Sequence, residues 1–258
     1  MKKGIIWLSS YPKCGNTYVR IFLSHYIYLG KDEPDFSLLN KIPKFEHKET
    51  FAKVFPNLDL NTNFVYYKHC IDVQQKLISK FDQKNLIYKT HHFFGKINGY
   101  EFTNEQNTLM FIYLIRDPRE VAVSYASHSG ISIEEQIEMF IGKDKINRVG
   151  YETKVNWMLS YKSWKSFNSV PSIFIKYEDL INDPVNFFSS IVYLLSRYTD
   201  IDYDLNKIKK VLKVIDFKKL KKLEEEKGFV ESMSGPFFRS GKTNTWQNIL
   251  NSDQVKKI

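Results

Sequence analysis

The sequence contains few of the residues that build disulfide frameworks or metal sites. Its 258 residues include two cysteines, Cys14 and Cys70, and six histidines. Two cysteines are too few for a disulfide framework, so a reducing compartment, the cytoplasm, is the simplest expectation. The cysteines and histidines show no metal-ligand spacing, which predicts a site that needs no metal ion.

Long hydrophobic runs are also missing. The apolar run 5–8 stops at Ser9, and no small-residue cleavage site follows, so it does not have the pattern of a signal peptide. The longest other run, 109–115, falls far short of the roughly 20 apolar residues that cross a bilayer. We therefore expect no membrane span.

The composition is that of a chain with a substantial core. With 43% hydrophobic and 16% aromatic residues, we expect one domain over residues 1–258. The formal net charge of +9 suits an anionic partner. Much of the excess lies in 207–227, where lysines alternate with apolar residues in the pattern of amphipathic helices with a solvated face. The charge run alone therefore does not indicate nucleic acid.

Short apolar runs alternate with segments of helical periodicity, which predicts an α/β fold with a central parallel sheet and helices on both faces. Strands are predicted at 5–8, 64–67, 86–90, 109–115 and 172–176. Helices are predicted at 73–81, 121–126, 133–141 and 152–167. In such folds ligands bind beyond the carboxyl ends of the strands. The proline-containing stretch 31–63 is expected to be loop-rich, with a short helix or two, and to cover a substrate site.

The loop 9–17 joins the first strand to a helix and is a candidate phosphate cradle. A turn at Gly15 leaves unpaired N–H groups at the helix N-terminus, where the helix dipole favours an anion. The loop is P-loop-like but is not a Walker A sequence, because Asn16 precedes Thr17 where a lysine is required. The only lysine of the loop is Lys13, and its displacement favours transfer of a different group.

Two further strand ends carry polar side chains. The strand 86–90 ends in a Lys-Thr-His-His sequence, and only one of His91 and His92 can easily face a shared cleft, because neighbours on an extended chain point to opposite faces. Arg116 ends the strand 109–115, with Ser124 about two turns along the next helix. These two side chains can grip a second phosphate.

The helix after Arg116 has a marked start. Asp117 is predicted to cap it, with Pro118 at its first position and Glu120 completing a capping box.

Together these motifs resemble the cytosolic-type sulfotransferases, which transfer a sulfuryl group from 3′-phosphoadenosine 5′-phosphosulfate (PAPS) to an acceptor hydroxyl or amine. YPKCGNTY at 11–18 is similar to that family's 5′-phosphosulfate loop YPKSGTTW, and KTH at 89–91 matches its KTH. IRDPREVAVSY at 115–125 resembles its 3′-phosphate motif, and YEDL at 177–180 its YED turn. FFRSGKTNTW at 237–246 resembles its RKGxxGDW segment. Five motifs in the family's order are far more specific than any one of them.

The resemblance implies a role for each matching residue. His91 takes the place of the catalytic base, and Lys13 would offset charge on the leaving phosphate. The 5′-phosphosulfate cradle would consist of Lys13, Cys14, Gly15, Asn16 and Thr17. The adenine would lie against Tyr18, Tyr177 and Phe217. The 3′-phosphate would be held by Arg116, Ser124, Arg239, Ser240 and Gly241. Ser240 stands where the family has lysine, which predicts weaker 3′-phosphate binding unless Lys242 reaches back.

The acceptor and the rival functions follow from the same features. Aromatic residues in 31–63 and 228–236 favour a small acceptor with an apolar or aromatic part. A P-loop kinase that uses ATP and magnesium is one alternative, and it would need a lysine at Asn16 and a metal-holding carboxylate at Asp117. A basic nucleic-acid-binding module is the other, and it would need lysines interleaved with exposed aromatics.

Overall fold

The computed structural model describes residues 3–28, 32–60, 63–81, 86–142, 147–149, 152–239 and 241–258. At its centre lies a four-stranded sheet in the order β2-β1-β5-β8, and all its strand pairs are parallel. The strands are β1 (Ile5–Ser10), β2 (Leu86–Thr90), β5 (Thr108–Ile115) and β8 (Ser172–Lys176). Two small hairpins pair β3 (Lys96–Ile97) with β4 (Tyr100–Glu101) and β6 (Asn147–Val149) with β7 (Glu152–Lys154).

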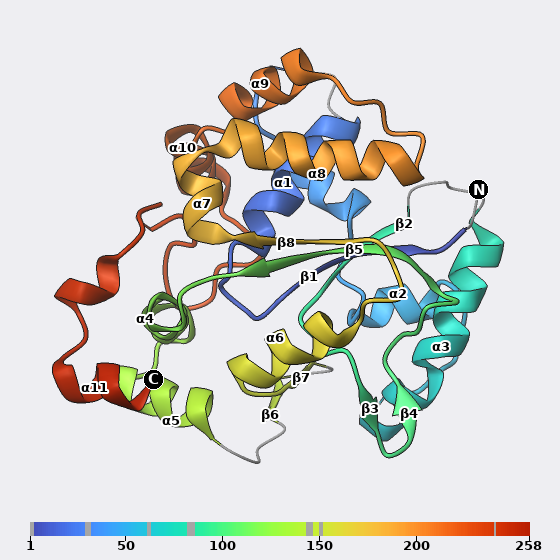
Figure 1. Cartoon of the computed structure of the whole chain (residues 1–258), viewed down its shortest axis with the longest axis horizontal. Helices are drawn as coiled ribbons and strands as arrows, with labels where there is room; N and C mark the ends of the chain where they lie inside the picture. Colours follow the sequence, from blue (N-terminus) through green and yellow to red (C-terminus); the bar gives the residue numbers. More distant parts are fainter. Residues whose placement is uncertain are drawn as a thin grey trace.

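Helices cover both faces of the sheet, as predicted (Figure 1). The described helices are α1 (Asn16–Tyr28), η1 (Phe36–Lys41), α2 (Lys48–Ala52), α3 (Asn63–Lys80), α4 (Pro118–Ser129), α5 (Ile133–Ile141), α6 (Trp157–Ser166), α7 (Tyr177–Asn182), α8 (Pro184–Tyr198), α9 (Leu205–Val214), α10 (Phe217–Lys227), η2 (Thr245–Asn248) and α11 (Ser252–Lys257). In Figure 1, α1, α8 and α9 lie on one side of the sheet, and α3 and α6 lie on the other.

The central strand shows why the apolar runs form buried strands. Every residue of β1 is buried, because β2 and β5 flank it and helices cover both faces. Ile6 and Leu8 belong to the core with α1 and α8, whereas Ile5 and Trp7 belong to the core with α3 and α6. The one polar atom of Trp7 is satisfied, because its indole N–H donates to Thr108 Oγ1 over 3.1 Å.

Two of the predicted elements were wrong. The predicted strand 64–67 is the first part of α3, because Tyr66, Tyr67, Cys70, Val73 and Leu77 recur at the spacing of one helix face and are all buried. The predicted helix 152–167 is a strand followed by a shorter helix. That helix, α6, begins at Trp157, where the side chain of Asn156 caps it by accepting a hydrogen bond from Leu159 N.

The stretch 32–60 carries η1 and α2 and extends the sheet beside β2. Phe45 N donates to the Lys89 carbonyl over 2.9 Å, and Lys89 N donates to the Pro43 carbonyl over 3.0 Å. This pairing fixes the stretch against the carboxyl end of β2, so it lies next to the Lys-Thr-His-His sequence.

Two observations concern the surface. Among the described residues, no helix combines the length and the apolar character needed to cross a membrane.

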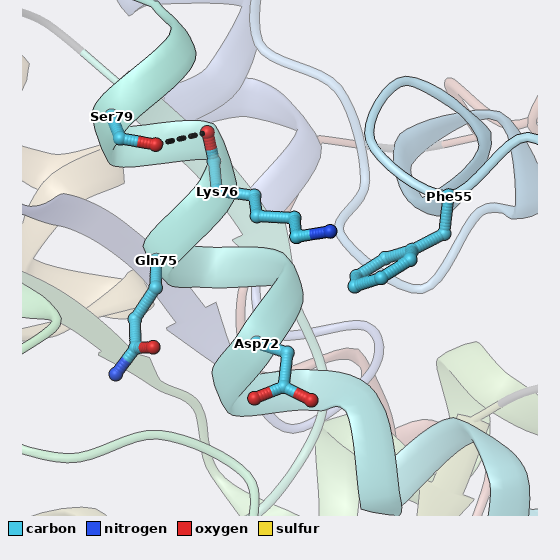
Figure 2. A pocket seen from close by; sticks show the side chains of 5 residues that line it. All are labelled: Phe55, Asp72, Gln75, Lys76 and Ser79. Atoms are coloured by element: carbon cyan, nitrogen blue, oxygen red, sulfur yellow. Dashed lines mark hydrogen bonds between the residues drawn. The ribbon is translucent and has the colours of Figure 1, made fainter.

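A surface pocket of about 490 Å³ lies on α3 and is lined by Phe55, Asp72, Gln75, Lys76 and Ser79. Figure 2 shows these side chains. Two of the lining side chains contact each other, because the Lys76 ammonium lies 3.8 Å from the centre of the Phe55 ring. None of the residues assigned to the site from the sequence lines it.

Candidate active site

Three strand ends meet at one edge of the sheet. Since β1 lies between β2 and β5, the loop after β1 is flanked by the Lys-Thr-His-His sequence and by Arg116. His91 Nδ1 lies 2.9 Å from the Ser10 carbonyl oxygen, and Arg116 Nη1 donates to the Lys13 carbonyl over 3.1 Å. The structure therefore brings the three predicted groups into direct contact.

The loop after β1 needs glycine at its turn. Gly15 has φ +89°, and a Cβ placed there would lie 2.3 Å from the Tyr177 ring. Lys13 also has a positive φ of 66°. These two left-handed residues turn the chain sharply into α1, whose first N–H groups have no partner within the helix. The geometry is that of an anion cradle at a helix N-terminus.

Asn16 stabilises this turn through hydrogen bonds to the end of β1. Its side-chain amide donates to the Leu8 carbonyl over 3.0 Å and to Ser10 Oγ over 3.2 Å. The amide thus faces β1, in the position where a Walker lysine would face phosphate. The Cys14 thiol faces the core, and burial raises its pKa to about 12.

Lys13 carries its charge in a partly buried position. Its ammonium lies 4.2 Å from the centre of the Phe237 ring. Burial, and next the positive charge of Lys89, lower the pKa of Lys13 to about 8. An anion bound beside Lys13 would offset both effects.

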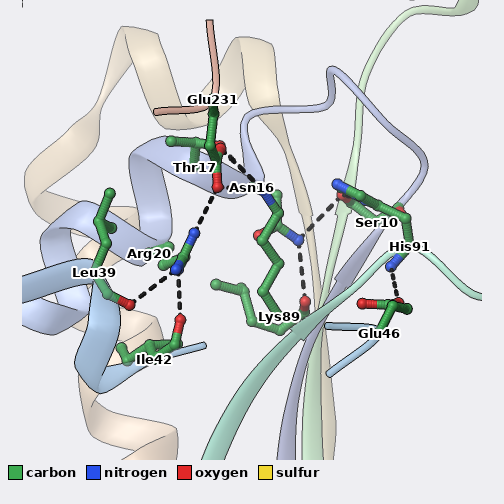
Figure 3. Close-up of polar contacts among 11 residues, drawn as sticks. Ser10, Asn16, Thr17, Arg20, Leu39, Ile42, Glu46, Lys89, His91 and Glu231 are labelled. Atoms are coloured by element: carbon green, nitrogen blue, oxygen red, sulfur yellow. Dashed lines mark hydrogen bonds and ion pairs between the residues drawn. The ribbon is translucent and has the colours of Figure 1, made fainter. Parts of the chain in front are cut away.

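A carboxylate that the sequence did not reveal lies at the same place (Figure 3). Glu231 Oε2 accepts from the Thr17 hydroxyl over 2.7 Å, and Glu231 Oε1 accepts from Arg20 Nη1 over 2.6 Å. Lys89 Nζ lies 3.0 Å from both carboxylate oxygens. Arg20 also donates to the carbonyls of Leu39 and Ile42. One local feature could have indicated a buried acidic partner here, namely that the charged residue Arg20 lies on the buried side of α1.

The two histidines have different environments. The Ser10 carbonyl can only accept a hydrogen bond, so Nδ1 of His91 is the donor in the 2.9 Å contact, and in the neutral ring the lone pair then lies on Nε2. The side chain of Glu46 accepts from His91 N over 3.0 Å and also from the Thr90 hydroxyl. His92 is fully buried, and its Nδ1 lies 2.9 Å from the Tyr67 hydroxyl. Of these two histidines, His91 is the one that contacts the loop.

Arg116 lies at the end of β5 between two neighbours. Its guanidinium lies 4.4 Å from the centre of the Tyr177 ring, and its Nη2 donates to Glu120 over 3.0 Å. Glu120 also accepts from Trp246 N over 2.9 Å and from the Thr245 hydroxyl. Within the described residues, Arg116 Nε is buried without a hydrogen-bond partner. The Arg116 side chain as a whole keeps 11% exposure, so a second anion can be held by its accessible edge.

The start of α4 was predicted in part. Asp117 caps the helix by accepting from Arg119 N, and Pro118 is its first residue, as expected. The capping box was wrong, because Asp117 N donates instead to Glu178 over 3.0 Å. Glu120 is therefore free of the helix start and binds the C-terminal segment.

The structure describes all but one of the other predicted nucleotide residues. Gly241 has φ +61°, and a Cβ there would lie 2.8 Å from the Phe217 ring, so these two residues are in contact. Arg239 is exposed, and its charge contributes to the lowered pKa of Lys13. Tyr18 packs edge-on against Phe188. Ser124 is half-buried on α4, and Ser240 lies outside the described residues.

Comparison with known proteins identifies this arrangement. The family model described as "Sulfotransferase domain" matches residues 3–258. The chain belongs to the sulfotransferase family. The predicted resemblance to the sulfotransferases is thereby confirmed at the level of the family.

Individual relatives are distant but cover nearly the whole chain. Cytosolic sulfotransferase 17 of Arabidopsis thaliana is 24% identical over 98% of this chain and 71% of its own length. Luciferin sulfotransferase of Photinus pyralis is 23% identical over 98% of this chain and 69% of its own. The solved structure of retinol dehydratase with retinol and PAP matches with a TM-score of 0.65 at 18% identity, covering 100% of this chain and 79% of that one. The fold of this sulfotransferase is thus shared with solved relatives, and the predicted α/β class is confirmed.

The turn at Gly15 gives a test of the cradle in this sulfotransferase. Gly99 also has a positive φ, of 83°, but a Cβ there would meet nothing within 4 Å. Gly99→Ala should cost about 1 kcal/mol of unfolding free energy through backbone strain alone. Gly15→Ala adds overlap with Tyr177 and should cost about 3 kcal/mol or more. Urea denaturation of both variants measures the difference, and equal losses would contradict close packing of Tyr177 on the turn.

Proposed function

We propose that the chain transfers the sulfuryl group of PAPS to an acceptor hydroxyl or amine, with His91 as general base. The observation that carries the proposal is the hydrogen bond from His91 Nδ1 to the Ser10 carbonyl, which leaves the lone pair on Nε2. A neutral imidazole in that tautomer can accept a proton. The histidine is held against the same loop that forms the anion cradle.

Two anion positions suit a nucleotide with phosphate at both its 3′ and 5′ positions. Lys13, Thr17 and Lys89 supply an ammonium pair and a hydroxyl at the first position. Arg116, with its buried Nε, and the exposed Arg239 supply the second. The solved complexes of retinol dehydratase and of a mouse sulfotransferase contain PAP, the desulfated form of this donor, which supports the assignment.

The residues divide the chemistry between them. When bound, PAPS supplies a sulfuryl group on a phosphate leaving group. His91 Nε2 takes the acceptor's proton as the acceptor oxygen or nitrogen bonds to sulfur. Lys13 and Lys89 offset the negative charge that builds on the phosphate oxygen as its bond to sulfur breaks, and Thr17 donates a hydrogen bond there. This scheme requires no metal ion.

We infer a small acceptor with an apolar or aromatic part. Luciferin, retinol and androsterone appear in the names of the relatives and their complexes, which supports this class. Not all aromatic residues of the stretch 32–60 can line an acceptor pocket, because Phe45 and Phe51 are buried in the core. Phe36 and Phe229 contact each other with ring centres 4.6 Å apart and join that stretch to the C-terminal segment.

The names of two relatives include "cytosolic", which supports a cytoplasmic location.

The structure disfavours both alternatives. In a kinase Asp117 would hold magnesium, but its carboxylate caps α4 and pairs with Arg119 over 2.6 Å. In a nucleic-acid-binding module the lysines of α9 and α10 would share a face with aromatics. Their apolar faces instead pack into the core through Ile208, Val211, Val214 and Leu220.

Substitution of the two histidines separates catalysis from packing. His91→Ala should reduce kcat by about 100-fold or more, because general bases typically contribute that much, and should leave PAP affinity within a few-fold. His92→Ala should lower thermal stability, since it removes a fully buried ring, and should reduce kcat much less than His91→Ala, because His92 reaches the site only through Glu46, 3.9 Å from its Nε2. Kinetics and calorimetry on both variants measure these effects. An active His91→Ala beside a folded but inactive His92→Ala would overturn the assignment.

The lowered pKa of Lys13 predicts a pH dependence of donor binding. Lys13 is charged below its pKa of about 8 and neutral above it, so PAP should bind more weakly as pH rises past that value. The loss should approach about tenfold per pH unit until the pKa of the complex is reached. Titration calorimetry from about pH 7 to about pH 9.5 measures it. Lys13→Arg, which stays charged, should flatten the profile. A profile that is the same in both proteins would contradict the role of Lys13.

Nucleotide preference separates sulfuryl from phosphoryl transfer. PAP can fill both anion positions, whereas ATP and 5′-AMP fill one. Because a charged hydrogen bond is worth roughly 1.5–3 kcal/mol, PAP should bind about a hundred-fold tighter than either. EDTA should not change this, since the cationic groups belong to the chain. Calorimetry with the three nucleotides decides the question, and a preference for ATP that EDTA abolishes would restore the kinase hypothesis.

A further inference from the structure

Glu231 contacts the groups that the proposed function assigns to the 5′ end of the donor. Its carboxylate accepts from the Thr17 hydroxyl over 2.7 Å and lies 3.0 Å from the Lys89 ammonium. Figure 3 shows the carboxylate pointing from its own segment into the space between α1 and β2. A carboxylate and a phosphate oxygen are the same kind of acceptor for a hydroxyl and an ammonium group.

The contact also balances buried charge. Arg20 and Lys89 are both buried, and burial lowers the pKa of Lys89. Two buried cations without a counter-charge are strongly unfavourable. Glu231 supplies that charge, and its own pKa is held far below its usual range by Lys89 and Arg20 despite its burial. Arg20 would keep two carbonyl acceptors, Leu39 and Ile42, if Glu231 moved away.

The chain around Glu231 can move away from the site without exposing much apolar surface. It is anchored at its ends by Phe229 and Phe238, which are both buried. Between them Val230 is 91% exposed and Met233 is 68% exposed, so moving this part of the chain would uncover little apolar surface. Gly228, with φ +71° and open space around it, precedes the segment. Hydrogen bonds hold the middle of the segment, from Ser232 to Glu224 and from Ser234 to carbonyls of α4. Near its end, Phe237 donates its N–H to Glu224 and packs its ring against Phe229, Phe238 and the Lys13 ammonium.

We propose that Glu231 is an internal competitor for the 5′ phosphate of the donor. This inference rests on the proposed function, because it assumes that the donor's 5′ end binds at Lys13, Thr17 and Lys89. The donor's phosphate displaces the Glu231 carboxylate and takes over its counter-charge role toward Lys89 and Thr17. Binding of a 5′-phosphorylated ligand is therefore coupled to movement of the chain around Glu231, between the buried anchors Phe229 and Phe238, whereas a ligand that carries only a 3′-phosphate leaves Glu231 in place.

The test compares three nucleotides in two proteins. Glu231→Gln keeps the shape of the side chain and one acceptor oxygen but removes the charge that competes. PAP and 5′-AMP should bind about tenfold tighter to this variant, by the same factor, because both displace the side chain. The affinity of 3′-AMP should not change. Glu226→Gln is the matched control, since it removes the same charge from an exposed position on α10 and should change none of the three affinities.

The outcomes separate this inference from the proposed function. If the wild type prefers PAP but Glu231→Gln binds PAP no tighter, or binds all three nucleotides more weakly, Glu231 is a structural part of the site and the inference is wrong. If the wild type binds none of the three, the proposed function falls, and this inference with it. Should Glu231→Gln not fold, Glu231→Asp keeps the charge but is too short to reach its three partners together, and a smaller tightening of the same two nucleotides is expected. No tightening in Glu231→Asp would likewise overturn the inference.

Discussion

The balance of positive charge at the carboxyl ends of β1, β2 and β5 is the constraint on which the site depends. Burial and mutual repulsion lower the pKa of Lys13 to about 8, and burial together with Lys13 lowers that of His128 to about 4. Two carboxylates offset this charge. Glu231 pairs with Lys89 and Arg20, and Glu120 pairs with Arg116. Both link the site to the C-terminal part of the chain, because Glu231 belongs to it and Glu120 binds Trp246 N. Both anion positions are therefore linked by charge to the C-terminal part of the chain.

Local sequence predicted the parts of the fold in which one pattern dominates. The apolar runs 5–8 and 109–115 form β1 and β5, and they have no polar alternation because both faces of these strands are covered. A surface helix of the same length would instead carry polar residues on one side. The segment 64–67 misled because a short aromatic run also suits a helix, and only its continuation at Cys70, Val73 and Leu77 shows the helical spacing. The start of α6 depended on Asn156, a capping residue that follows a two-stranded hairpin.

The site was predictable where its residues follow strands and not where they come from distant segments. Lys13, His91 and Arg116 each follow an apolar run, so the parallel sheet itself brings them together. Glu231 lies 142 residues from Lys89 along the chain, and Glu46 lies 45 residues from His91. No local pattern marks either carboxylate, since an acidic residue in a polar loop is ordinarily solvated. Their roles exist only after the C-terminal segment and the stretch 32–60 pack against the strand ends.

In the proposed function, the stretch 32–60 would connect acceptor recognition to the orientation of His91. Pro43 and Phe45 pair with Lys89 at the end of β2, and the next residue, Glu46, accepts hydrogen bonds from His91 N and the Thr90 hydroxyl. The other side of His91 is fixed by the Ser10 carbonyl. His91 is thus held between the loop after β1 and a segment that we infer to face the acceptor. A change in that segment that alters the acceptor pocket would also shift Glu46, so acceptor specificity and the position of His91 cannot vary independently.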